Sequence, residues 1–434
     1  MNIALESILL IHGQPDFDTK ISRLLKEHSM RAFLEDKQEL AASVRRIVAD
    51  VGKRGDAAVS EYSERFDRVR LSPEEFRISA EELKKAHSRL EPALLQSLRK
   101  AIENVRLYQS QIFIGGRTSH PGIRYLPLQR VGLCIPGASA PLPSTLIMAA
   151  VPAQTAGVQE IVVVSPPRWQ ASIHPVILGL CYELNITEVY RLGGAHAVAA
   201  LAFGTQTIPK VDKIVGPGHD VVQLAKKEVY GMVDIDSFAG PSDVLIIADS
   251  QAEPEWVAAD ILSQAEHNPG AGILVTDSLP FARNVLAELE KQLPQLNRAE
   301  GTARCLLEYS GILVFQSLDA AVDWANEFAA EHVQVQCGPQ SRKIADRLRN
   351  AGAVFIGPYS PVAVGDYWAG PSHTLPTRQT SRYFSALTSN DFIKSISIIE
   401  YSEEQLRRSA EDIIRLALTE GLDAHAASIQ KRLR

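Results

Sequence analysis

The spacing of apolar residues changes once along the chain. From position 36 to about 112 they recur every three or four residues, which predicts a run of amphipathic helices. From Val131 onward, short apolar runs alternate with helical stretches, a pattern typical of βαβ units and parallel sheets. The predicted strands are 131–135, 161–164, 189–192, 213–215 and 232–236, followed by 244–248, 273–276, 312–315, 333–336 and 354–356. The simplest account is an α/β fold with two doubly wound, Rossmann-like sheets of about five strands each.

The two ends of the chain have patterns of their own. Residues 1–30 predict an arm that packs on something else. Residues 401–434 are helical again: Ser402 and Gln405 match a capping box, and Gly421 ends the first helix. A second helix is expected to begin near position 423, with His425 in its first turn.

Glycine and proline cluster where predicted strands end, in IPG at 135–137, LGG at 192–194 and VGPG at 215–218. In doubly wound sheets, ligands bind beyond the C-terminal ends of the strands. No GxGxxG follows any predicted strand, so the usual dinucleotide fingerprint is absent. These turns could still admit a pyrophosphate, although most glycine turns only reverse the chain.

Bulk properties exclude several classes of protein. The 434 residues are 45% hydrophobic and 22% charged, as in an ordinary globular chain. The net charge of -6 argues against a nucleic-acid partner, and no apolar run approaches the roughly 18 residues of a membrane span. The four cysteines are scattered without CxxC spacing, and the N-terminal stretch lacks the features of a signal peptide. A cytoplasmic location is therefore expected.

Glu331 and His332 stand side by side where the helical stretch 320–330 gives way to the strand 333–336. Irregular backbone at such junctions often displays catalytic groups. A His titrates near neutrality and a Glu can activate water, so the pair suits general acid–base chemistry. The alternative is a solvated dipeptide on a loop.

Metal ligands are suggested by two further segments. The helical pattern 254–267 carries Gln264 on its apolar stripe and His267 three residues later on the same face, where both need partners. A metal would provide partners for both side chains, and so would hydrogen bonds to a neighbouring strand. The segment 357–377 is too rich in Gly and Pro for a helix or strand and predicts a long functional loop with Asp366 and His373. Gln264, His267, Asp366 and His425 together would suit zinc, although a Gln ligand is unusual.

Several motifs together resemble the histidinol dehydrogenase family from about residue 30 to the C-terminus. They are PGASAPLPSTLIMAAVPAQTAGV (136–158), DSFAGPSDVLIIAD (236–249), SQAEH (263–267), AAEHV (329–333), GPYSPVAVGDYWAGPSHTLPT (357–377) and EGLDAH (420–425). Independent motifs in the same order are far more specific than any one of them.

The resemblance implies a role for each matching residue. Zn²⁺ would be held by Gln264, His267, Asp366 and His425, while Glu331 activates water and His332 acts as general base. The substrate, histidinol or a close relative, would contact Ser242, Gln264, His267, His332, Asp366, His373, Glu420 and His425. NAD would take two successive hydrides, oxidising the alcohol through an aldehyde to an acid. A homodimer with swapped tails is implied as well.

The implied domains are an arm (1–30), a catalytic and metal-binding α/β domain (31–128 plus 243–385), a cofactor domain (129–242) and a swapped tail (386–434).

The chain departs from the family at the positions that hold the cofactor. Cys134 stands where the family has Tyr, His196 where it has Gln, and His219 where it has Asn. These are positions that the family uses to hold NAD, and Gly272 replaces a further Gln. Losing an aromatic ring and two amides would weaken or alter cofactor binding. His196 and His219 could equally be packing residues, Ser242 could cap a turn, and His373 could brace its loop.

Three functions therefore remain open. The first is a zinc- and NAD-dependent histidinol dehydrogenase. The second keeps the zinc site but oxidises another alcohol or uses another cofactor, as the replacements at Cys134, His196 and His219 suggest. The third is a non-catalytic, metal-dependent binding or regulatory protein, which would have little use for Glu331 beside His332.

Overall fold

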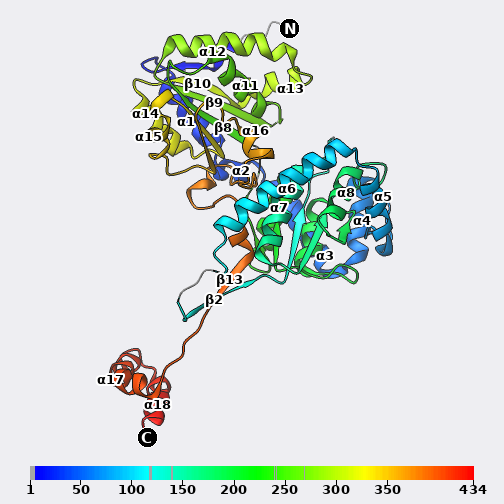
Figure 1. The fold of residues 1–434 in the computed structure, drawn as a ribbon, viewed down its shortest axis with the longest axis vertical. Helices are drawn as coiled ribbons and strands as arrows, with labels where there is room; N and C mark the ends of the chain where they lie inside the picture. Colours follow the sequence, from blue (N-terminus) through cyan, green and yellow to red (C-terminus); the bar gives the residue numbers. More distant parts are fainter. Residues whose placement is uncertain (1–4, 117–119, 138–139, 239, 241, 268) are drawn as a thin grey trace. The chain divides into compact units, whose positions relative to one another are not determined.

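The chain divides into two compact units. The computed structural model describes residues 5–116, 120–137, 140–238, 240, 242–267 and 269–434. Unit 1 comprises Met1–Phe113 and Pro127–Phe392, and unit 2 comprises Ile114–Leu126 and Ile393–Arg434. Figure 1 colours the chain from blue at the N-terminus to red at the C-terminus.

A parallel five-stranded sheet forms the first half of unit 1. Its strands lie in the order β5-β4-β3-β6-β7. Their bounds are β3 (Arg130–Cys134), β4 (Glu160–Val164), β5 (Glu188–Tyr190), β6 (Lys213–Val215) and β7 (Asp234–Ile235). All five predicted strands are confirmed, and the last is shorter than expected. The order reverses between β3 and β6, because the chain adds β4 and β5 on one side and then returns to the other.

Helices from two parts of the sequence cover this sheet. Those between its strands are α7 (Pro143–Ala156), α8 (Pro175–Glu183), α9 (Gly194–Phe203) and α10 (Asp220–Val229). Those that precede it are α2 (Met30–Asp36), α3 (Gln38–Arg54), α4 (Asp56–Asp67), η2 (Pro73–Glu75), α5 (Ala80–Ser88) and α6 (Pro92–Ile112). Val44, Val48 and Val51 of α3 share a core with Val162 and Ile214 of the sheet. Assigning 31–128 to the domain of 243–385 was therefore wrong, because the apolar faces of these helices are buried on the five-stranded sheet.

A parallel six-stranded sheet forms the second half of unit 1, in the order β1-β10-β9-β8-β11-β12. Its strands are β1 (Leu9–Ile11), β8 (Ser242–Ala248), β9 (Gly270–Thr276), β10 (Gly311–Val314), β11 (His332–Gln336) and β12 (Ala353–Ile356). The five predicted strands are confirmed. The predicted N-terminal arm needs correction: residues 1–4 lie outside the described residues, but Leu9–Ile11 pairs with β10 as an edge strand of this sheet.

Both faces of the six-stranded sheet are buried. Val244 and Ile246 of β8 pack on one side and Leu245 and Ile247 on the other, as alternation along a strand requires. The first face is covered by η1 (Leu5–Ile8), α11 (Pro254–Ala265), α12 (Leu279–Gln292), η3 (Leu293–Gln295) and α13 (Ala299–Tyr309). The second is covered by α1 (Phe17–Glu27), α14 (Leu318–Phe328) and α15 (Ser341–Ala345), with η4 (Gly338–Gln340) before α15. Unit 1 continues through α16 (Val362–Tyr367), η5 (Thr380–Arg382) and η6 (Ser389–Phe392).

Unit 2 is a small sheet followed by two helices. The strands β2 (Ile123–Pro127) and β13 (Ile393–Ser397) pair with each other. The helices are α17 (Glu403–Thr419), with the predicted capping box at its start, and α18 (Asp423–Arg432). The predicted tail was 386–434. Unit 2 instead combines the C-terminal residues that follow Phe392 with the earlier segment 114–126. Across the described residues, no helix combines the length and apolarity of a membrane span.

Candidate active site

Glu331 and His332 lie where the sequence predicts, at the junction of α14 and β11. Ala329 ends the helix with a φ of 53°, and His332 is the first residue of β11. Both side chains are almost fully buried, with 6% of Glu331 and 3% of His332 exposed. The pair is therefore not a solvated dipeptide.

Asp243, which sequence reasoning missed, positions both members of the pair. Its carboxylate Oδ1 accepts a hydrogen bond from the Glu331 N–H at 2.8 Å, and its own N–H donates to Glu331 Oε2 at 3.2 Å. Its main-chain carbonyl lies 2.9 Å from Nδ1 of His332. The available signal was a carboxylate inside the otherwise apolar strand β8, where a buried charge needs partners.

This arrangement determines the tautomer of His332. A carbonyl oxygen only accepts, so Nδ1 carries the hydrogen and Nε2 keeps a lone pair. Nε2 lies 3.8 Å from Asp366 Oδ1. Burial lowers the pKa of His332 to about 4, with a further contribution from the rings of His373 and His267. His332 is therefore a neutral imidazole that can accept a proton at Nε2.

The pKa of the Glu331 carboxyl is shifted in the opposite direction, upward. Burial raises its pKa well above the ordinary value, and the negative charge of Asp243 adds to the effect. Burial also raises the pKa of Asp243, to about 7. A carboxylate with a raised pKa accepts a proton from water more readily than an ordinary one, which suits a general base.

Asp366 and His373 meet His332 at one cavity. Asp366 lies on α16, a short helix inside the segment 357–377; the prediction that this segment is irregular throughout was wrong. Nδ1 of His373 lies 3.2 Å from the carbonyl oxygen of Asp366. All three side chains line a cavity of about 370 Å³, with Phe355 beside them. Burial raises the pKa of Asp366 to about 6 and lowers that of His373 to about 4.

Gln264 lies in the last turn of α11, buried as expected from the apolar stripe that contains Val257 and Ile261. The hydroxyl of Ser242 donates to its Oε1 at 2.9 Å. The helix ends at Ala265, so the predicted helix to position 267 is too long. His267 lies exposed in the following turn, where its N–H donates to the Gln264 carbonyl at 3.2 Å.

The predicted zinc ligands are divided between the two units. Gln264, His267 and Asp366 belong to unit 1, whereas His425 is exposed on α18 and Glu420 follows α17 in unit 2. In the part of the chain that the structure describes, no group of three or more His, Cys, Asp or Glu side chains is close enough to hold a metal. Gln264 falls outside those residue types.

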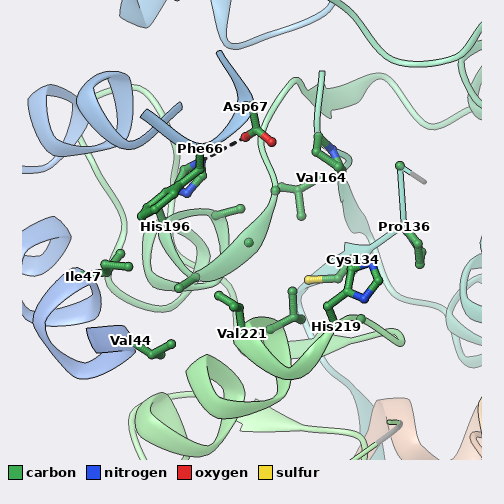
Figure 2. A pocket seen from close by; sticks show the side chains of 18 of the residues that line it. Val44, Ile47, Phe66, Asp67, Cys134, Pro136, Val164, His196, His219 and Val221 are labelled. Carbon is green, nitrogen blue, oxygen red and sulfur yellow. Dashed lines mark ion pairs between the residues drawn. The ribbon is translucent and has the colours of Figure 1, made fainter. Parts of the chain in front are cut away.

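A second cavity, of about 390 Å³, is lined by Cys134, His196 and His219, the three residues predicted to lie at the cofactor (Figure 2). It lies where β3, β4 and β6 end, at the point where the strand order reverses. Cys134 and His196 are buried, and His219 is the exposed residue just before α10. Burial raises the pKa of the Cys134 thiol to about 12 and lowers that of His196 to about 4, so both are neutral.

Gly272 does not belong to this cavity lining. It lies on β9, and a Cβ there would come within 2.9 Å of the Ile261 carbonyl of α11. The glycine therefore allows close packing of helix on strand.

Comparison with known proteins identifies the family of this chain. The model of the histidinol dehydrogenase family matches residues 31–433. The chain belongs to the histidinol dehydrogenase family. A histidinol dehydrogenase of Synechococcus sp. is 46% identical over 398 residues, covering 90% of this chain and 92% of that protein. One of Geobacillus kaustophilus is 43% identical over 422 residues, covering 95% and 99%.

A solved structure agrees as well. The crystal structure of histidinol dehydrogenase from Elizabethkingia anophelis covers 98% of each chain, with a TM-score of 0.88 and 32% identity. The α/β architecture with parallel sheets is therefore that of the histidinol dehydrogenase family.

Proposed function

We propose that the protein oxidises L-histidinol through the aldehyde to L-histidine, with NAD as hydride acceptor and zinc as bound metal. The observation that supports this most is the pair Glu331 and His332, buried together and both oriented by Asp243. His332 also shares a cavity with Asp366 and His373, where a small polar substrate would fit.

Zinc would be held by Gln264, His267, Asp366 and His425. Oxygen and nitrogen donors with one formal negative charge suit this ion. We propose that His425 comes from the tail of a second copy in a cytoplasmic homodimer, which also brings Glu420 to the substrate. When bound, zinc would orient the substrate through its nitrogen or oxygen atoms, and NAD would accept the hydride in each oxidation.

The chain's own residues would move the protons. Nε2 of His332 accepts the hydroxyl proton of the alcohol as its carbon loses the hydride, because Nδ1 is committed to Asp243. In the second oxidation Glu331 takes a proton from water, whose oxygen attacks the aldehyde carbon. His332 returns its proton to the aldehyde oxygen as water adds, and accepts a proton again as the resulting hydrate loses its hydride. Ser242 and His373 would contact the substrate.

We propose that NAD binds in the cavity lined by Cys134, His196 and His219. Its position at the reversal of strand order is where dinucleotides bind in Rossmann-like sheets. The protonated thiol of Cys134 would offer a small apolar contact in place of an aromatic ring.

The test is a steady-state assay with zinc-loaded protein, L-histidinol and NAD. Two equivalents of reduced cofactor should form for each histidinol consumed, with histidine as the product. No turnover with NAD or NADP would contradict the proposal.

A second candidate, a family member with another alcohol or cofactor, is favoured by the replacements at Cys134, His196 and His219. A panel of primary alcohols and cofactors separates the two. A clear preference for histidinol with NAD would exclude the second candidate.

A further inference from the structure

One carboxylate in the cavity of about 390 Å³ lacks a full set of partners. Asp67 is the last residue of α4, and its side chain is only 3% exposed. Oδ1 lies 3.5 Å from Nε of Arg168. Oδ2 has no hydrogen-bond partner among the described residues and lies 3.8 Å from Nε2 of His196. Figure 2 shows the carboxylate and this ring pointing toward each other.

The position of Asp67 is costly for stability. A buried charge without good hydrogen bonds is unfavourable, and a carboxylate at the C-terminus of a helix opposes the helix dipole. Arg168 offsets little of this, because its side chain is 51% exposed and the pairing distance is long. Such a residue on a cavity wall indicates a ligand that supplies the missing hydrogen bonds.

The neighbouring His196 does not neutralise the carboxylate. Its Nε2 lies 3.3 Å from the hydroxyl of Ser63, and burial keeps the ring uncharged at neutral pH. Asp67 therefore offers acceptor lone pairs to the cavity, which is lined mostly by apolar side chains such as Val44, Ile47 and Phe66. A ligand with a flat apolar part beside neutral hydroxyl groups fits this wall, and adenosine is such a group.

We propose that Asp67 accepts hydrogen bonds from the ribose hydroxyl groups of the adenosine half of the dinucleotide and so determines a preference for NAD over NADP. This inference rests on the proposed use of a nicotinamide cofactor. Dinucleotide sites commonly place an acidic residue against the 2′-hydroxyl. In this chain the acid comes from the end of α4 rather than from the sheet. The 2′-phosphate of NADP would replace a donor with negative charge beside a carboxylate.

Calorimetry with NAD and NADP on the full-length, zinc-loaded protein tests the inference. The wild type should bind NAD more tightly than NADP, and Asp67→Asn should reduce that preference about tenfold, since a charged hydrogen-bond acceptor is lost. Glu64→Gln is the matched control, because it removes an exposed carboxylate one turn earlier on α4. It should leave the preference unchanged.

Arg168→Gln tests the inference in the opposite direction. It changes an exposed side chain, so the test can be made even if Asp67→Asn fails to fold. Removing the cation beside Asp67 should increase the preference for NAD. Equal changes in the affinities for NAD and NADP in both variants would overturn this inference while leaving the proposed function intact. A wild type that binds neither cofactor would overturn both.

Discussion

The main-chain carbonyl of Asp243 accepts a hydrogen bond from Nδ1 of His332 at 2.9 Å, while the Asp243 carboxylate accepts one from the Glu331 N–H at 2.8 Å. A single residue of β8 thus orients both groups that the proposed chemistry requires. Because the first contact uses the main chain and the second the side chain, substitution at Asp243 can separate them.

Asp243→Ala should impair the second oxidation more than the first. The variant leaves the Glu331 N–H buried without its acceptor, at a cost of about 1–3 kcal/mol, but keeps the carbonyl that orients His332. Aldehyde should therefore be released and can be measured with a carbonyl-trapping reagent. Asp243→Asn is the control, because it keeps an acceptor oxygen and removes only the charge. Equal loss of both oxidations in Asp243→Ala would contradict this role.

His332→Asn should reduce kcat by about 10²- to 10⁴-fold, the usual contribution of a general base. Zinc content, measured by elemental analysis, should stay unchanged. His12→Asn, at an exposed histidine, should have no effect on either quantity. Loss of zinc from His332→Asn would show that its role has been misassigned.

Ser242→Ala should weaken zinc binding about 10- to 100-fold, because the Ser242 hydroxyl orients the side-chain amide of Gln264 by donating to its Oε1 at 2.9 Å. Competition with a metal chelator measures this change. Ser263→Ala is the matched control on α11, since that hydroxyl donates to the Asp260 carbonyl of its own helix. If turnover falls while zinc affinity is unaltered, Ser242 acts on the substrate instead.

The buried ring of His196 should make the protein less stable in mild acid. Its pKa is lowered by burial from 6.5 to about 4, so between these values the unfolded chain binds more protons than the folded one. The free energy of unfolding therefore falls as the pH drops, by about 2 kcal/mol at this group between pH 7 and pH 5. Denaturant titrations at both pH values should show a smaller loss for His196→Gln. An identical pH dependence in the two proteins would refute the assignment.

Leu10→Ala should lower the free energy of unfolding by about 2–5 kcal/mol, as expected for a large-to-small change in a core. Leu10 belongs to β1 and is 5% exposed on a sheet face shared with Leu313. Gln14→Ala, at an exposed residue just beyond the strand, is the control for chemical denaturation. A negligible effect of Leu10→Ala would contradict the burial of β1 in this core.

Local features of the sequence predicted much of the fold. The ten predicted strands are present because buried parallel strands are continuous apolar runs, and such runs are visible without knowledge of their neighbours. The junction at Glu331 and His332 and the capping box at Ser402 were also predicted, since each depends on a few adjacent residues.

Long-range packing decided the rest. The short run Leu9–Ile11 became a strand only because β10 supplied its partner, and α3 joined the five-stranded sheet because its apolar stripe found a core there. The role of Asp243 depends on contacts with residues far along the chain, and the cavity beside Asp67 is lined by six separate segments. The sequence alone determined which residues are apolar, chargeable or able to turn the chain. Which of them meet was decided by tertiary structure, because burial and hydrogen bonding act between segments whose separation along the chain carries no information about their distance in space.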